Sequence, residues 1–223
     1  MFTAKDSSLS DFSQLNQQGI EYYVHYLAME LENEAKTINR KLSALQSLFH
    51  YLMKQYHLKE NPVQAVTRPK VKKREPVYLS IEEMKAVMAL TLNDEGLTLR
   101  QKKYHRLLAL RDLTAITLLV RTGLRVSELA SLKRSQLHVG RKEMQVLGKG
   151  NKQRTIPLTD EVIEVIQHYL QSLPETVQPK QEDSLLVGFD FRTMTYSRSI
   201  SVSALQKMIQ RLFERAKKSN SFS

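Results

Sequence analysis

The sequence predicts a mainly α-helical protein of two domains, the second of which contains a small antiparallel β-sheet. Apolar residues recur at helical spacing over most of the chain. After Leu132 the period becomes extended, and two short apolar stretches flank a turn rich in glycine and lysine. Between the helical regions lies a basic segment, residues 67–78, that two prolines bracket. We therefore expect a helical domain over residues 1–66, a linker over 67–78 and a second domain over 79–223.

The charge of the chain favours a polyanionic partner. The 223 residues include 34 lysines and arginines against 23 acidic residues, which gives a net charge of +11. Such a charge steers a protein toward nucleic acid, and counterion release favours the binding of phosphates. Nucleic acid is the first candidate, and the alternatives are an anionic membrane surface or a basic surface that only aids solubility.

The composition also argues against several classes of protein. No apolar run approaches the about 18 residues of a membrane span, and the N-terminus lacks the apolar core of a signal peptide. Hydrophobic residues make up 41% of the chain, which is enough to bury a core. The absence of cysteine excludes disulfides and thiolate metal sites. We therefore expect a soluble, cytoplasmic protein with neither a metal nor a cofactor.

Two helices are expected in the first domain, after a polar start at residues 1–18. The first begins near Gly19, and the second follows with Thr37 as its N-cap and continues for about five turns. Asn61 and Pro62 end this unit, because a proline moves the residue before it out of the helical region.

Basic residues lie where a DNA backbone could meet them. Arg40 and Lys41 lie opposite the apolar side of the second helix, where a solvated face and a phosphate contact are equally good interpretations. The expected linker is extended and basic, so it can follow a DNA backbone or serve as a solvated hinge. Its candidate DNA-binding residues are Lys70, Lys72, Lys73 and Arg74.

The second domain begins with a capping box made by Ser80 and Glu83. A polar interval over residues 93–103 is expected to be a loop, and a central core helix follows over 104–121. Gly123 is expected to end that helix in the left-handed conformation. The next helix contains VSELASL. Strands are then expected at 137–138, 144–147 and 154–158, and residues 184–189 are expected to be a strand or a buried turn. Two further helices are expected, one from Thr159 and one from near Ser201.

Arg125 lies where a loop leads into the helix that contains VSELASL. A guanidinium group at such a position, with free backbone N–H groups beside it, suits a phosphate.

Four segments in order carry a resemblance to a known family. They are TINRKLSALQSLFHYL, NPVQAVTRPKVKKREPVYLSIEEM, RTGLRVSELASL and GKGNKQRTIPL. Together they resemble the tyrosine recombinase or phage integrase family, in particular its Xer-like bacterial branch, over about residues 20–218. The resemblance implies a helical core-binding domain that binds DNA and a mostly helical catalytic domain that clamps a duplex with it. It also implies site-specific strand exchange through a 3′-phosphotyrosyl intermediate, without ATP, and other recombinase protomers as partners.

The resemblance assigns three site residues. Arg125 matches the first catalytic arginine, whose fork would stabilise charge on a phosphate. Glu128 matches an acidic position that helps to orient the site, although an ordinary helix-surface carboxylate is nearly as good an interpretation. Lys149 matches a hairpin lysine that resembles a general acid for the leaving 5′-oxygen, with a solvated turn residue as the alternative.

The family pattern continues with a His-x-x-Arg motif, a further His or Trp, and a nucleophilic tyrosine on a late helix. The second catalytic arginine and the nucleophile have no matching residues in this sequence. His138 to Arg141 spells His-x-x-Arg, but it precedes Lys149 and is interpreted as a coincidence. Tyr196 is the last tyrosine and precedes the final expected helix instead of following it, so we do not expect it to be the nucleophile.

Three functional hypotheses follow from this pattern. The first is a truncated recombinase that cannot cleave DNA alone, either part of a longer coding region or completed by another polypeptide. The second is a non-catalytic DNA-binding remnant or modulator of an intact recombinase, and the third, weaker, is an unrelated basic helical regulator. Truncation would also expose part of the apolar face around Ile209 and Phe213.

Overall fold

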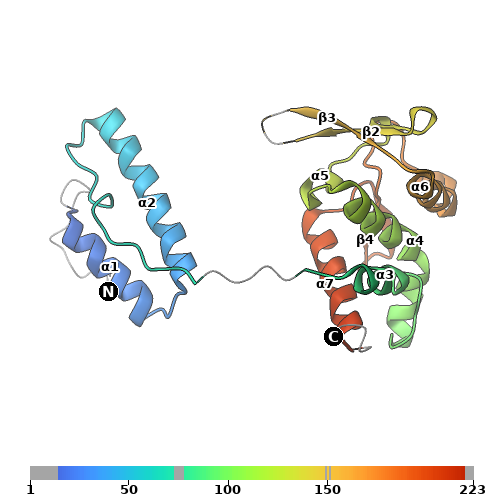
Figure 1. Ribbon diagram of the computed structural model, residues 1–223, viewed down its shortest axis with the longest axis horizontal. Helices are drawn as coiled ribbons and strands as arrows, with labels where there is room; N and C mark the ends of the chain where they lie inside the picture. The colour runs from blue at the N-terminus through green and yellow to red at the C-terminus, as the bar shows by residue number, and fades with distance from the viewer. Residues whose placement is uncertain (1–14, 73–77, 149, 151, 219–223) are drawn as a thin grey trace. The chain divides into compact units, whose positions relative to one another are not determined.

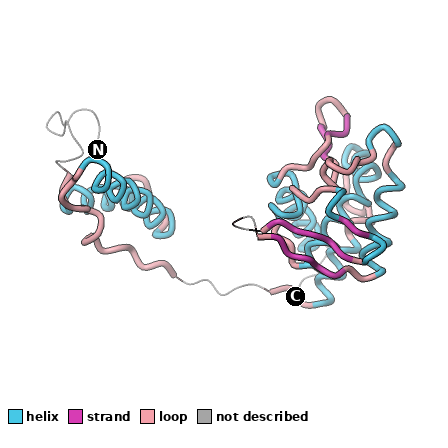
Figure 2. Tube along the Cα trace, turned by 90° about the horizontal axis from the view of Figure 1, so that it is seen from above, coloured by secondary structure: helices cyan, strands magenta, loops and turns pink. Residues whose placement is uncertain are grey.

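The structure is a computed structural model that describes residues 15–72, 78–148, 150 and 152–218. The chain forms two compact units, Met1–Val77 and Tyr78–Ser223, each with its own hydrophobic core. Helices dominate both units, and the strands of the described residues all lie in the second (Figures 1 and 2). The predicted mainly helical fold with a small antiparallel sheet is therefore confirmed.

The first unit is built on two helices, α1 (Gln17–Met29) and α2 (Ala35–Tyr56), which lie side by side (Figure 1). The side chain of Asn16 caps α1 by accepting a hydrogen bond from the Gly19 backbone. The prediction that Thr37 caps the second helix is wrong, because α2 already begins at Ala35. The core of the unit consists of Ile20, Leu27, Ile38, Leu42, Phe49, Val63 and Val66.

The segment that follows α2 returns along it and is bonded to it. The Arg68 guanidinium donates to the Asn39 carbonyl, to Ser43 Oγ and to Gln46 Oε1 at 2.7–3.1 Å. Asn39 in turn donates to the Pro69 carbonyl at 2.9 Å. The first residues of the predicted linker are thus held on α2.

The second unit contains α3 (Ile81–Ala89), α4 (Leu99–Thr122), α5 (Val126–Ala130), α6 (Asp160–Ser172) and α7 (Val202–Lys218). The predicted capping box of Ser80 and Glu83 is present at the start of α3. The prediction of a loop as far as residue 103 is wrong, since α4 begins at Leu99 with its own capping box from Thr98 and Gln101.

The end of α4 is as predicted. Gly123 has φ +64°, in the left-handed region that glycine adopts without strain, and its N–H donates to the Leu119 carbonyl. The chain therefore turns at Gly123 and enters α5 directly after Arg125.

A three-stranded antiparallel sheet follows α5, in the order β1 (Leu137–His138), β2 (Glu143–Leu147) and β3 (Gln153–Pro157). Val146 on β2 pairs with Arg154 on β3. A second antiparallel pair, β4 (Gly188–Asp190) and β5 (Thr195–Ser197), forms a separate hairpin, of which only the first strand was expected. Short 3-10 turns occupy Arg134–Gln136, Val139–Arg141 and Glu175–Val177.

The last helix, α7, packs into the core of the second unit. Leu205, Met208, Leu212 and Ala216 are its buried residues, and Ile209 and Phe213 are half-buried against the same core. The half-burial of Ile209 and Phe213 is compatible with the expected partial exposure of this face, although both side chains also pack on the core. Arg215 also donates to the carbonyls of Leu90, Asn93 and Glu95, which ties α7 to the connection between α3 and α4.

Candidate functional site: a hollow beside Arg125

Arg125 presents a largely free guanidinium group at the start of α5. Its side chain is 70% exposed, and its Nη1 donates to Glu128 Oε1 at 3.0 Å. Its backbone N–H donates to Glu128 Oε2 at 2.9 Å. A guanidinium carries five N–H donors, and among the described residues only Glu128 takes one of those of Arg125, which leaves the others for a ligand.

Glu128 is buried beneath Arg125, with a side chain that is 6% exposed. Both of its oxygens also accept hydrogen bonds from Arg154 on β3, from Nη1 at 2.9 Å and from Nη2 at 2.8 Å. These bonds from Arg154, with those from Arg125, outweigh burial and lower the pKa of Glu128 from 4.5 to about 2. Glu128 is therefore an ionised carboxylate with its acceptor positions filled, and it has no capacity left to act as a base.

Arg154 is the residue of this site that the sequence analysis missed. The same bond to Glu128 raises the pKa of Arg154, so it is fully charged. The alternation of side chains along β3 could have indicated it, because Arg154 and Ile156 share the less exposed face of the strand. A charged side chain on an inward face needs a partner of opposite charge. The identity of that partner, 26 residues earlier in the chain, could not be read from the alternation.

A hollow of about 290 Å³ lies between α5 and the end of the β2–β3 hairpin, which are neighbours in Figure 1. Its lining comes from Arg125, Ser127, Glu128, Ser131, Leu147 and Gly148. The predicted residues Arg125 and Glu128 are thus brought together, next to the strand that leads into the hairpin turn. Lys149 lies outside the described residues, so its predicted role stays a prediction.

The remaining basic candidates lie in the first unit. Arg40 and Lys41 are on α2, where Arg40 is exposed and Lys41 half-buried, and Lys70 and Lys72 are exposed on the segment that follows. Lys73 and Arg74 lie outside the described residues. None of these four described cations forms an ion pair with any residue that the structure describes. All four can therefore meet an anionic partner.

Comparison with known proteins decides the family. Residues 93–223, more than half of the chain, match the family described as "Phage integrase family", and residues 2–56 match "Phage integrase, N-terminal SAM-like domain". The chain belongs to the phage integrase family. The resemblance inferred from the sequence motifs is therefore confirmed.

Relatives of this integrase-family chain include Xer proteins. It is 34% identical over 175 residues to "Tyrosine recombinase XerC" of Bacillus pumilus, covering 78% of this chain and 53% of the relative. It is 30% identical over 168 residues to "Tyrosine recombinase XerD" of Lacticaseibacillus casei, covering 74% and 54%. The chain spans about half the length of the curated relatives it matches.

Solved integrases share the fold. The Tn1549 transposon integrase in complex with transposon right end DNA matches with a TM-score of 0.67 at 18% identity, over 94% of this chain and 67% of that one. A lambda integrase dimer bound to a COC′ core site matches with a TM-score of 0.63 at 16% identity, over 92% and 52%.

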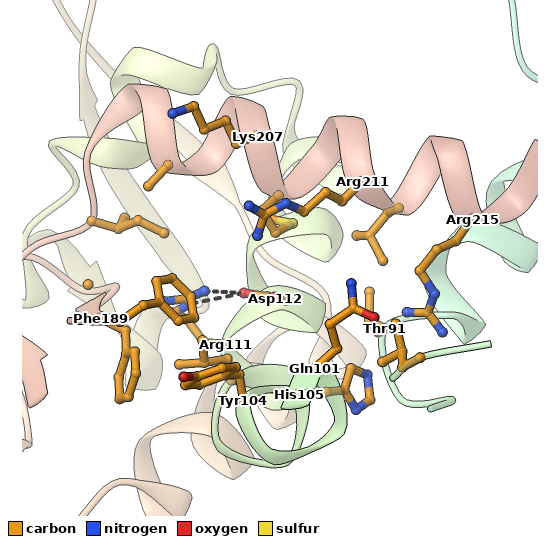
Figure 3. Close-up of a pocket in the computed structure, with 18 of the residues that line it drawn as sticks. Thr91, Gln101, Tyr104, His105, Arg111, Asp112, Phe189, Lys207, Arg211 and Arg215 are labelled. Carbon is orange, nitrogen blue, oxygen red and sulfur yellow. Dashed lines mark hydrogen bonds and ion pairs between the residues drawn. The ribbon is translucent and has the colours of Figure 1, made fainter. Parts of the chain in front are cut away.

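A second, larger cavity of this integrase-family chain is separate from the Arg125 hollow. It has a volume of about 840 Å³, and the two share no lining residue. Figure 3 shows α7 on one side of it, with Lys207, Arg211 and Arg215, and on the other side α4, with Arg111 and Asp112 joined by an ion pair. None of the predicted site residues lines this cavity.

Tyr196 and the His138–Arg141 segment also lie apart from the hollow. The Tyr196 hydroxyl donates to the Leu107 carbonyl at 3.3 Å, and its ring packs edge-on against Phe189. Arg141 pairs with Glu143 at 3.1 Å. Neither Tyr196, His138 nor Arg141 contributes to the lining around Arg125.

Two kinds of feature are absent from the described residues. No helix among them is both long and apolar enough to cross a membrane. In the same part of the chain, no three His, Asp or Glu side chains are grouped so that they could hold a metal ion.

Proposed function

We propose that this chain is a duplex-DNA-binding part of a site-specific tyrosine recombinase, and that Arg125 holds the scissile phosphate. The observation that carries the proposal is the exposed guanidinium of Arg125 at the rim of a hollow that α5 and the β2–β3 hairpin share. A phosphate placed there would accept hydrogen bonds from the free N–H groups of Arg125. The chemistry it would undergo is the family's, in which a tyrosine attacks and a 3′-phosphotyrosyl link forms.

The charges around the hollow support a bound phosphate. Arg125, Glu128 and Arg154 together carry a net charge of +1, and the carboxylate of Glu128 points at the two arginines. The negative charge of Glu128 is already compensated by hydrogen bonds from both arginines, so it does not prevent Arg125 from binding a phosphate. The hairpin turn that begins at Gly148 contains Lys149, which we propose as the general acid for the leaving 5′-oxygen.

The first unit would supply sequence-independent backbone contacts. Arg40, Lys41, Lys70 and Lys72 are the cations of the described residues that we assign to this task, and Lys73 and Arg74 extend it. Such contacts position a protein on a duplex without reading its sequence. The solved relatives named above were determined with DNA, which is in keeping with the same partner here.

We further propose that a polypeptide of these 223 residues binds DNA without cutting it. Tyr196 uses its hydroxyl for the Leu107 carbonyl and does not line the hollow, and no other tyrosine lies after the β2–β3 hairpin except Tyr169, whose hydroxyl is buried and accepts from Val187. The alternative biological role is a modulator that occupies a site or pairs with an intact recombinase. Two additions would separate the roles: completion restores cleavage to a cleavage-deficient relative, whereas modulation inhibits cleavage by an intact one.

Binding and cleavage are tested on two duplex substrates. The chain is titrated into a fluorescent 30-base-pair duplex at 50–200 mM salt, and then incubated with a nicked suicide duplex that traps covalent adducts. We expect salt-sensitive binding, about tenfold weaker for Arg125→Gln, and no adduct. Arg100→Gln, which removes an exposed cation outside the hollow, is the control and should leave affinity nearly unchanged. Failure to bind at low salt would refute the proposal, and a tyrosine-linked adduct would refute the absence of cleavage.

A further inference from the structure

The carboxylate of Glu128 joins two arginines that lie far apart in the chain. Arg125 lies at the start of α5, and Arg154 bonds Glu128 from β3 without lining the hollow itself. Each carboxylate oxygen accepts one bond from Arg125 and one from Arg154. The four bonds measure 2.8–3.0 Å, which is the normal range for charge-assisted hydrogen bonds.

The two arginines do not share Glu128 equally. Arg154 gives two guanidinium N–H groups, one to each oxygen, in the bidentate geometry that fits a carboxylate best. Arg125 gives only one guanidinium N–H, and its other bond comes from its backbone. The carboxylate is thus turned toward β3, and the fork of Arg125 is left open.

Without Arg154, the charges would rearrange. Glu128 follows Arg125 by three residues on the same helical turn, so its carboxylate could pair with both arms of that guanidinium. An internal carboxylate that occupies the fork competes directly with a phosphate, because both ligands use the same planar donors. The net charge of the group would also fall from +1 to zero.

The same contact fixes the hairpin to α5. Arg154 pairs across the sheet with Val146, and the next residues of β2 are Leu147 and Gly148, which line the hollow. A Cβ built on Gly148 would lie 3.3 Å from Arg154 Nη1 and 3.4 Å from the Lys152 carbonyl, so a larger residue there would press on the guanidinium. The turn that contains residue 149 therefore begins next to the Arg154–Glu128 pair.

We propose that Arg154 is a positioning residue, which acts through Glu128 to keep the fork of Arg125 open for a phosphate and to hold the β2–β3 hairpin beside it. This inference rests on the proposed function, because it takes a DNA phosphate as the ligand of Arg125. Arg154 itself need not touch the phosphate, since both of its terminal nitrogens are already bonded to Glu128.

The test compares Arg154→Gln with Arg154→Lys, alone and in a Glu128→Gln background, on the fluorescent 30-base-pair duplex. We expect Arg154→Gln to weaken binding about tenfold, and Arg154→Lys, which restores the charge but not the bidentate geometry, to recover part of the loss. In the Glu128→Gln background no carboxylate remains to occupy the fork, so Arg154→Gln should change affinity by less than about threefold.

A matched control comes from another arginine–glutamate pair. Arg121 on α4 bonds both oxygens of Glu161 on α6 at 2.9 Å, at the surface and away from the lining of the hollow. Arg121→Gln removes the same charge and breaks an arginine–glutamate pair that is exposed and lies outside the lining of the hollow. We expect it to change duplex affinity by less than about twofold.

Two outcomes would overturn the inference. If Arg154→Gln binds like the unsubstituted chain, Arg154 does not govern the site. If it weakens binding equally with and without Glu128, Arg154 contacts the phosphate itself. The failure of the proposed function looks different, because Arg125→Gln would then bind as well as the unsubstituted chain.

A measurement without DNA tests the positioning role independently. The Nε–H signal of Arg125 in a nitrogen-15 spectrum reports the partner of its guanidinium. It should shift in ligand-free Arg154→Gln, and return part of the way in Arg154→Lys. An unchanged signal would overturn the inference even for a chain that bound no duplex, and Arg154→Lys serves if the glutamine variant does not fold.

Discussion

The guanidinium of Arg111 pairs with the carboxylate of Asp112, its neighbour in the chain, at the wall of the α4–α7 cavity (Figure 3). Nη2 and Nε of Arg111 donate to Asp112 Oδ1 at 2.6 and 2.9 Å, and Nη1 donates to the Val187 carbonyl at 3.4 Å. Burial raises the pKa of Asp112 in spite of the opposing attraction of Arg111. The desolvation of the carboxylate therefore outweighs its pairing, which is the usual balance for a buried ion pair.

This balance predicts that losing one partner harms the fold more than losing both. Arg111→Met should lower the free energy of unfolding by about 3 kcal/mol, because the partly buried Asp112 carboxylate loses its hydrogen-bonded counter-charge. The double variant Arg111→Met with Asp112→Leu should lose less than that single variant. Urea unfolding of Arg111→Met, Asp112→Leu and the double variant measures the three losses, and losses of the single variants that simply add in the double variant would contradict the prediction.

Glu128 predicts a specific pH dependence of stability. Its folded pKa of about 2 lies below the unfolded value of 4.5, so its contribution is full above 4.5 and is lost as pH falls toward 2. The difference corresponds to about 3 kcal/mol. We expect Glu128→Gln to be less stable than the unsubstituted chain by about this amount at pH 7, and the gap to narrow below pH 4.5.

The exposed carboxylate of Glu161 provides the control for that measurement. Glu161→Gln breaks an ion pair whose side chains are 49% and 57% exposed, so it should cost at most about 1 kcal/mol. If the difference in free energy of unfolding between Glu128→Gln and the unsubstituted chain stays constant between pH 7 and pH 3, the low pKa assigned to Glu128 is contradicted.

Local signals allowed part of this architecture to be predicted from the sequence. The capping box at Ser80 and Glu83 and the glycine stop at Gly123 depend on a few neighbouring residues, and both are present. The predicted start of α4 is too late although Thr98 and Gln101 form a capping box, because the residues that follow them are polar and do not show the apolar stripe of a helix. Arg125 and Glu128 were found because they lie three residues apart in one motif.

Features that depend on distant parts of the chain could not be predicted in this way. Arg154 meets Glu128 only because β3 folds back against α5, and no spacing in the sequence encodes that distance. The half-burial of Ile209 and Phe213 likewise depends on how α7 packs against the rest of the unit. Tertiary contacts of this kind are set by the whole core, so the local pattern leaves them undetermined.

The packing of α7 predicts that polar substitutions on its inner side destabilise the second unit. Ile209→Ser and Phe213→Ser should each lower the free energy of unfolding by about 1–3 kcal/mol, since both side chains pack on the core. Leu99→Ser is the control, because Leu99 is 88% exposed and should be nearly neutral. Thermal unfolding and the soluble fraction after expression measure the effect, and improved solubility of either α7 variant would show that this face is exposed after all.

The cations of α2 predict a change in the salt dependence of DNA binding. If Arg40 and Lys41 each neutralise one phosphate, replacing both with glutamine should reduce the slope of log K against log salt by about 1.8. The loss should be the same for unrelated duplex sequences, because backbone contacts carry no sequence information. Lys85→Gln with Arg100→Gln removes two exposed cations of the second unit and serves as the charge-matched control. An equal change of slope in both double variants would mean that the effect comes from net charge, and that α2 makes no phosphate contacts of its own.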